Sequence, residues 1–297
     1  MPRIDLNEGL ERRNAGHFGF SAVKREDLGA SEYTLVTIVD DVSGSTAGFT
    51  KEMEAAVKEI VSACAHSERA DNLMIRLVKF DTQVMEVHGY KLLNQCSGGD
   101  YDGALRPGGA TALYDATIDA MEASLNFAEE LDEQEDILSN GIVFVITDGY
   151  DNSSTYTPKE VGKSLRAAIK SEKLESLVTV LISVDHQGYT QFVIVKEDED
   201  RHEISDFNAA SVDGKTYDKY DDASQAAKAN PGTKVVPVYQ QGEQLSEFDR
   251  TARFSAFLPL EDSSKNTLAK LAQFVSKSIS SQSQSLGTGK PSESVTF

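Results

Sequence analysis

The segment YTLVTIVDDVSGS (residues 33–45) joins a run of mostly β-branched apolar residues to a short polar group. Residues 33–39 are apolar or threonine throughout, as expected for a central strand of a parallel sheet that is buried on both faces. Asp41, Ser43 and Ser45 follow at alternate positions. The segment therefore predicts a buried strand whose carboxyl end carries a polar site.

Three further runs of this kind follow along the chain: LMIRLVKF (73–80), IVFVIT (142–147) and LVTVLISV (177–184). The segments between them have the spacing of helices with one apolar face, because apolar residues recur at steps of three and four. The predicted stripes are Phe49, Met53, Ala56, Ile60 and Cys64; Tyr114, Ile118, Met121, Leu125 and Ala128; and Val161, Leu165, Ala168 and Ile169. This alternation predicts an α/β fold with a doubly wound, mostly parallel sheet between two layers of helices.

The regular pattern stops after Asp185 and resumes near residue 253. Residues 186–250 are rich in charge, and within them only QFVIV (191–195) and TKVVPVY (233–239) resemble strands. We expect an inserted lobe here, either a β-hairpin arm or a partly mobile segment.

RFSAFL (253–258) predicts the last strand, and a last helix follows with the stripe Leu268, Leu271, Val275 and Ile279. The predicted organisation is an N-terminal extension (1–30), one domain (31–285) with the insertion at about 186–250, and a flexible tail (286–297). The acidic stretch EELDEQED (129–136) predicts a solvated helix end and loop.

Composition narrows the classes of partner. The 297 residues include 29 Lys and Arg against 48 Asp and Glu, and the net charge of −19 opposes binding to nucleic acid or to an anionic membrane. The start, MPRIDLNEGLERR, lacks the apolar core of a secretory signal, which favours a cytoplasmic protein. Cys64 and Cys96 form no CxxC pair, so we expect two reduced structural thiols.

Three polar segments follow predicted strands: DVSGS (41–45), GGAT (108–111) and TDGYDN (147–152). The carboxyl ends of parallel strands meet at one edge of a sheet, so these segments are expected to converge. Together Asp41, Ser43, Ser45, Thr111 and Asp148 offer only oxygen donors, which favours a hard cation over zinc or copper. We expect Mg²⁺, with Mn²⁺ or Ca²⁺ as alternatives.

DVSGS, GGATALYDA (108–116) and TDGYDN, at these separations, resemble the von Willebrand factor type A domain, and the chain resembles its intracellular bacterial members in size. The resemblance covers about residues 30–185 and, less closely, 250–285. In that family the first motif, the threonine and the last aspartate form the metal ion-dependent adhesion site. The resemblance thus assigns metal binding to Asp41, Ser43, Ser45, Thr111 and Asp148.

The family resemblance also implies a six-stranded sheet, mostly parallel with one short antiparallel edge strand, for which QVMEVHGY (83–90) is suited. It implies that a carboxylate of a partner protein completes the metal shell, since two acidic donors leave the cation with a positive field. Intracellular bacterial relatives are often partners of AAA+ ATPases or parts of stress-response and tellurium-resistance assemblies. An exposed Asp or Glu of such a protein is the expected ligand.

Some residues have a second interpretation. Asp40 stands where the family is usually apolar, and either tunes the site or ends the strand. Ser45 and Thr111 are also suitable helix caps. Asp115 and Asp151 are either extra ligands or ordinary turn and first-turn aspartates. The insertion lies where the family needs only a short connection, and is a candidate for partner specificity.

Three functions are compatible with these residues. The favoured one is a metal-dependent protein-binding module, an adaptor or scaffold rather than an enzyme. The second is a structural subunit of a larger assembly that uses the fold without metal. The third is a magnesium-dependent hydrolase with Asp41 as nucleophile, which is disfavoured because Ser43 stands where phosphoaspartyl enzymes have a second aspartate.

Overall fold

The computed structural model describes residues 7–14, 18–184, 191–239 and 243–288. Its centre is an eight-stranded sheet with the order β1-β2-β5-β4-β3-β6-β7-β10. In chain order these strands are β1 (Leu10–Arg13), β2 (Phe20–Val23), β3 (Glu32–Asp41), β4 (Leu73–Phe80), β5 (Val84–Leu92), β6 (Leu138–Thr147), β7 (Leu177–Ser183) and β10 (Ala256–Pro259). Five of them, β4, β3, β6, β7 and β10, are neighbours and run parallel, so their carboxyl ends share one edge.

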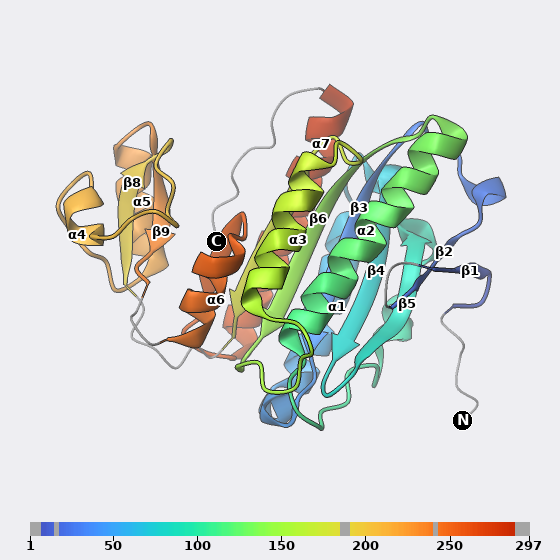
Figure 1. Ribbon diagram of the computed structural model, residues 1–297, viewed down its shortest axis with the longest axis horizontal. Helices are drawn as coiled ribbons and strands as arrows, with labels where there is room; N and C mark the ends of the chain where they lie inside the picture. Colours follow the sequence, from blue (N-terminus) through green and yellow to red (C-terminus); the bar gives the residue numbers. More distant parts are fainter. Residues whose placement is uncertain (1–6, 15–17, 185–190, 240–242, 289–297) are drawn as a thin grey trace.

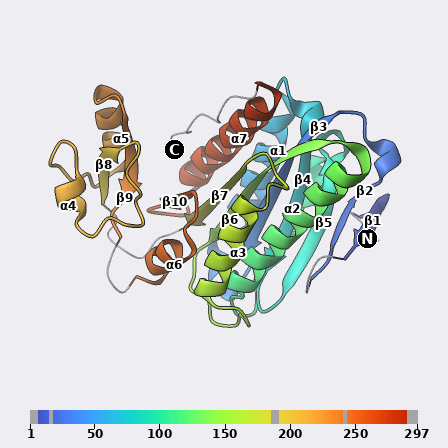
Figure 2. The same cartoon turned by 45° about the horizontal axis from the view of Figure 1, so that its top comes forward.

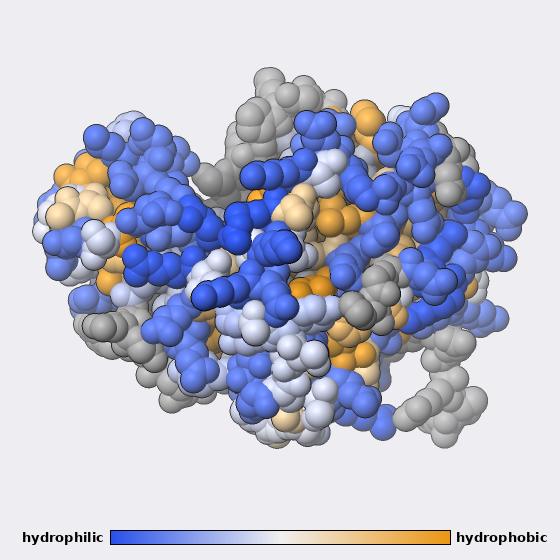
Figure 3. Space-filling view, in the orientation of Figure 1, coloured by the Kyte–Doolittle hydropathy of each residue, from blue (hydrophilic) through white to orange (hydrophobic). Residues whose placement is uncertain are grey.

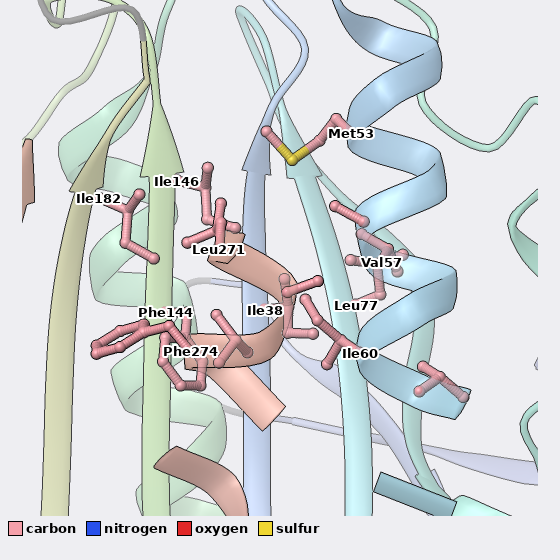
Figure 4. Close-up of a cluster of buried hydrophobic side chains, with 14 of the residues drawn as sticks. Ile38, Met53, Val57, Ile60, Leu77, Phe144, Ile146, Ile182, Leu271 and Phe274 are labelled. Atoms are coloured by element: carbon pink, nitrogen blue, oxygen red, sulfur yellow. The ribbon is translucent and has the colours of Figure 1, made fainter. Parts of the chain in front are cut away.

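Helices cover both faces of this sheet (Figure 1, Figure 2). On one face lie α1 (Thr50–Ala65) and α7 (Lys265–Thr288); on the other lie α2 (Leu113–Glu135) and α3 (Pro158–Lys170), with α6 (Gln244–Ala252) beside α3. Figure 4 shows the first core, in which Met53 of α1 and Leu271 of α7 lie over strand residues such as Ile38. The expected three-layer α/β fold is confirmed.

Most of the predicted apolar stripes are buried. All five stripe residues of α1 and all four of α7 are in the core. The prediction that Ile169 belongs to the buried stripe of α3 is wrong, because its side chain is 57% exposed. The acidic stretch 129–136 is helical as far as Glu135, since buried Leu131 extends the apolar face of α2 by another turn.

The sheet has two strands more than the six expected, and both come from the predicted N-terminal extension. β2 runs parallel to β5, with Ala22 opposite Tyr90, and β1 pairs with β2. β5 is antiparallel to β4, as expected, but β2 covers its outer side and it is not an edge strand. β1 and β2 are four residues each, too short for a periodic pattern to reveal them.

A glycine and a buried charge fix β2 against β5. A Cβ atom at Gly89 would lie 1.9 Å from the carbonyl oxygen of Ser21, so only glycine permits this approach. The Ser21 N–H donates to both carboxylate oxygens of Glu86 at 3.1 Å, and Glu86 also pairs with buried Arg76 at 2.9 Å. A second carboxylate, of Asp119 on α2, lies 2.9 Å from Arg76. The guanidinium therefore joins β4, β5 and α2.

Residues 191–239 form a lobe beside the β10 edge of the sheet (Figure 2). Both predicted strands form, as the antiparallel pair β8 (Phe192–Lys196) and β9 (Thr233–Pro237). Two helices, α4 (Phe207–Ala210) and α5 (Tyr220–Ala229), pack against this pair. A small core of Val193, Val195, Ile204 and Val236 gives the lobe its own apolar centre.

The last part of the predicted insertion belongs to the main body. α6 packs on α3 at Gly162, where a Cβ atom would lie 2.6 Å from the carbonyl oxygen of Thr251. Buried Asp249 of α6 forms a bidentate pair with Arg201 of the lobe, and Arg201 also donates to the carbonyl oxygen of Phe254 at 2.6 Å. A buried ion pair thus joins lobe and body.

The last helix is longer than predicted. α7 continues to Thr288, into the segment expected to be a tail, and residues 289–297 lie outside the described part of the chain. None of the described helices has the length and apolar character needed to cross a membrane.

The contact between β2 and β5 predicts a position that cannot accept a side chain. We expect Gly89→Ala to destabilise the protein by about 3 kcal/mol, because the new methyl group must push β2 away from the sheet. Urea denaturation measures the loss. Gly98→Ala is the matched control, since nothing lies within 4 Å of a Cβ atom there, and similar stability of the two variants would contradict the packing of β2.

Candidate metal centre

The predicted site residues lie at the carboxyl edge of the sheet, where β3 and β6 are neighbours. Asp41 ends β3, and Ser43 and Ser45 belong to the turn that leads through a 3-10 helix (Gly44–Gly48) into α1. Asp148 directly follows β6, and Thr111 precedes α2 by two residues. Segments separated by more than a hundred residues therefore meet at one edge, as parallel topology allows.

Both carboxylate oxygens of Asp41 are held in place. Oδ1 accepts the Ser43 N–H at 2.7 Å, and Oδ2 accepts the Thr147 hydroxyl at 2.6 Å. Thr147 is the last residue of β6, so this second bond ties the ends of two adjacent strands together. Sequence reasoning gave Thr147 no role, although it stands directly before Asp148 in the third motif.

The remaining donors continue from Asp41 toward the surface. The hydroxyl oxygens of Ser43 and Ser45 are 3.1 Å apart, and Ser45 donates to Asp148 Oδ1 at 2.8 Å. A Cβ atom at Gly149 would lie 3.8 Å from the Ser45 hydroxyl and 3.9 Å from that of Thr111. The structure thus brings all five predicted residues to one place, with Asp41 and Ser43 buried and Ser45 exposed.

The turn that carries Thr111 is fixed by main-chain bonds. Gly108 donates to the carbonyl oxygen of Val42 at 2.8 Å, and Ala112 donates to that of Asp81 at 2.7 Å. Gly109 has φ of +73°, and a Cβ atom there would lie 2.8 Å from the Thr82 hydroxyl. Both the positive φ and the close approach to Thr82 require glycine at position 109. The glycines of the GGAT segment (108–111) therefore allow the turn that brings Thr111 to the site.

The loop after β6 is fastened to the start of α2. The Thr111 N–H donates to Asn152 Oδ1 at 2.8 Å. Asp151 accepts from the Tyr114 N–H at 3.2 Å, and Asp115 accepts from the Thr155 and Tyr156 N–H groups. The carboxylates of Asp115 and Asp151 therefore hold the loop, which is the ordinary structural role that the sequence left open for them.

The donor set suits a hard cation. Burial raises the pKa of Asp41, opposed by its hydrogen bonds from Thr147 and Ser43 and assisted by the nearby charge of Asp81. A bound cation would supply the positive charge that favours the ionised carboxylate. No group of three or more His, Cys, Asp or Glu side chains suited to a metal occurs among the described residues, so this site depends on hydroxyl donors beside two carboxylates.

Asp40 is next to Asp41 on β3, and its side chain points to the opposite face of the sheet. It is fully buried, and in the described part of the chain neither of its carboxyl oxygens has a hydrogen-bond partner. Burial, with a contribution from the charge of Asp41, raises the pKa of Asp40 from 3.8 to about 8. Asp40 is therefore a neutral acid at neutral pH and faces the core rather than the metal site.

This burial predicts a pH-dependent stability. The folded chain keeps the Asp40 proton up to about pH 8, whereas the unfolded chain releases it near 3.8, so stability falls as the pH rises through that interval. We expect Asp40→Asn to stabilise the protein by about 3 kcal/mol more at pH 9 than at pH 5.5. Denaturation at the two pH values measures this difference. Asp71→Asn, at an exposed position, is the control, and equal gains at both pH values would refute the buried acid.

Comparison with known proteins gives similarity of fold only. No family model matches the sequence, and no curated protein sequence matches it. Proximal thread matrix protein 1 from the mussel byssus aligns at 17% identity over 83% of this chain and 46% of that one, with a TM-score of 0.43. A second structure of that protein is described as having a zinc-occupied MIDAS motif, and it aligns at 18% identity over 84% and 46%, with a TM-score of 0.43.

Two bacterial structures give similar values. A von Willebrand factor type A protein from Catenulispora acidiphila aligns at 14% identity over 89% of this chain and 44% of that one, with a TM-score of 0.45. The PilB minor pilin from Streptococcus sanguinis aligns at 11% identity over 88% and 64%, with a TM-score of 0.46. This chain spans less than two thirds of the length of each of these proteins.

Proposed function

We propose that this protein is a metal-dependent protein-binding module. A divalent cation, Mg²⁺ in the first place, would be held by Asp41, Ser43, Ser45, Thr111 and Asp148, and an Asp or Glu of a partner protein would complete its shell. The observation that carries this proposal is the convergence of five oxygen donors, only two of them acidic, at an edge of the sheet where Ser45 is exposed. Two carboxylates leave a divalent cation able to attract a third from outside.

Binding is favoured over hydrolysis by the surroundings of Asp41. The groups that donate to its carboxylate in the described part of the chain are the main-chain N–H and the side chain of Ser43 and the hydroxyl of Thr147. None of them is an acid–base partner of the kind that a carboxylate nucleophile needs. Asp41 is well placed to orient its neighbours and poorly placed to attack a substrate.

The net charge of −19 supports a metal-bridged contact, because an acidic partner would otherwise be repelled. We propose an adaptor or scaffold of the cytoplasm, with an AAA+ ATPase or a stress-response complex as the partner. The other candidate, a structural subunit, would assemble without metal. Dependence of assembly on the five site residues separates these two roles.

Metal binding is the direct test of the site. Calorimetric titration of Mg²⁺ or Mn²⁺ into metal-free protein is expected to show one site, which Asp41→Ala and Thr111→Ala each lose while remaining folded. Asp71→Asn is the control, because Asp71 is exposed and lies just before β4, at the opposite edge of the sheet. This variant is expected to bind the metal within about threefold of the parent. Retention of binding by Thr111→Ala would rule out the proposed ligand set.

The metal-bound protein should distinguish an acid from its amide. With Mg²⁺ present, a capped glutamate is expected to bind and a capped glutamine is not, because only the carboxylate offers an anionic oxygen to the cation. Chelation of the metal should abolish glutamate binding. Nuclear magnetic resonance of labelled protein can follow the amides of Gly149 and Thr111 as ligand is added. Equal responses to the two compounds would contradict recognition of an acid.

A further inference from the structure

His202 lies where the lobe meets α6, and each of its ring nitrogens faces a carboxylate. The residue belongs to the connection between β8 and α4, and its side chain is 10% exposed. Nδ1 lies 2.9 Å from Oδ1 of Asp200 in the same connection, and Nε2 lies 3.9 Å from Oδ2 of Asp249 in α6. The ring of Tyr239 stacks on the imidazole, with the ring centroids 6.5 Å apart. The imidazole therefore stands between one carboxylate of the lobe and one of the main body.

The number of protons on the ring decides how many of these carboxylates it can satisfy. A neutral imidazole has one N–H. With that proton on Nδ1, the ring donates to Asp200 and turns the lone pair of Nε2 toward Asp249, and Nε2 is buried without a hydrogen-bond partner in the described part of the chain. With the proton on Nε2, a lone pair of Nδ1 would face Asp200 instead. Only the imidazolium, with an N–H on each nitrogen, is attracted to both carboxylates.

Both carboxylates are negative near neutral pH. Burial raises the pKa of Asp249, but the charge of Arg201 and the contact with His202 lower it further, and the net shift is downward. Burial also raises the pKa of Asp200, and its bonds from His202 together with the charge of Arg253 reverse that shift. The two acceptors therefore remain ionised over the range, near neutral pH, in which a histidine binds its second proton.

Other charged groups around the ring oppose or favour that second proton. The guanidinium groups of Arg201 and Arg253 oppose it, but Arg201 is paired with Asp249, and Arg253 is paired with Asp200 and Glu203. The other charged side chains of α6 nearby and of the cleft that His202 lines include Arg166, Glu197, Asp198, Glu199, Lys234 and Arg250. Acids and bases are thus mixed here, and the two carboxylates that face the ring nitrogens give the most direct attraction.

Side chains of this kind carry the attachment of the lobe. In the described part of the chain no main-chain hydrogen bond joins β8 or β9 to the large sheet, and the two sheets are separate. Figure 3 shows mainly hydrophilic residues on the visible surface where lobe and body face each other, with smaller apolar areas between them. Because the junction is polar, the strength of docking depends on the charges of its side chains.

We propose that His202 is a pH-sensitive clasp between the lobe and α6. A proton taken from solvent by the free ring nitrogen gives the imidazolium, which bridges Asp200 of the lobe and Asp249 of α6 and tightens docking. Because the docked lobe favours the imidazolium, the added stability is present at pH 5.5 and is lost as the pH rises to 8. This clasp is separate from the metal centre and does not depend on the function proposed for it.

Amide hydrogen exchange of the full chain, followed by nuclear magnetic resonance at pH 5.5 and pH 8, tests the clasp. The amides of Val193 and Val195 in β8 are buried and bond to β9, so their exchange reports opening of the lobe. Rates are divided by those of unstructured peptides at each pH to give protection factors. The ratio of protection at pH 5.5 to that at pH 8 is expected to be about tenfold larger in the parent than in His202→Gln. The buried acid Asp40 is present in both proteins, so its own pH dependence cancels in this comparison.

A control variant and a second measurement complete the test. His66→Gln removes an exposed histidine at the end of α1 and is expected to keep the ratio of the parent. Circular dichroism checks that both variants fold. Nitrogen-15 spectra of the His202 ring in the parent need no variant, and are expected to show two N–H groups at pH 5.5 and one at pH 8. Equal ratios in the parent and His202→Gln, or the same number of ring protons at both pH values, would overturn the proposal.

Discussion

The hydrogen bond from the Thr147 hydroxyl to Asp41 is the interaction on which the candidate site depends. It joins the ends of β3 and β6, which lie side by side in parallel register from Glu32 to Asp40. With its other oxygen bonded to the Ser43 N–H, the Asp41 carboxylate has one orientation. That orientation places the two serine hydroxyls and Asp148 in sequence from the core to the surface, with Ser43 buried and Ser45 exposed.

The turn before α2 and the loop after β6, at the same edge of the sheet, are held in place mainly by hydrogen bonds of the main chain. Gly109 adopts a positive φ so that the turn before α2 can lie against Thr82, and Asn152 holds the Thr111 N–H. Asp115 and Asp151 fasten the following loop by accepting its N–H groups. These carboxylates lie close to the metal centre, yet their oxygens are occupied by the protein itself.

Buried ion pairs attach the N-terminal strands and the lobe (residues 191–239) to the central sheet and its helices. Arg76, which is 1% exposed, connects β4 to β5 and α2, and through Glu86 the N-terminal strand β2. Arg201 connects the lobe to α6 through Asp249. Such pairs are costly to leave half-made, so each addition has one docked position. The lobe is thereby kept beside β10.

The sequence by itself determined the layered α/β fold, because parallel strands buried on both faces appear as apolar runs and the intervening helices as regular stripes. It also indicated the five oxygen-bearing residues of the candidate site. Asp41, Ser43, Ser45 and Asp148 lie at or just after the ends of two parallel strands, and Thr111 was identified by the resemblance of its motif. Only the tertiary structure decided the hydrogen-bonding roles of Thr147, Asp115 and Asp151, because a hydrogen bond between distant segments produces no periodic pattern in the sequence. The same is true of β1 and β2, whose four-residue lengths carry no pattern and whose position depends on the missing side chain of Gly89.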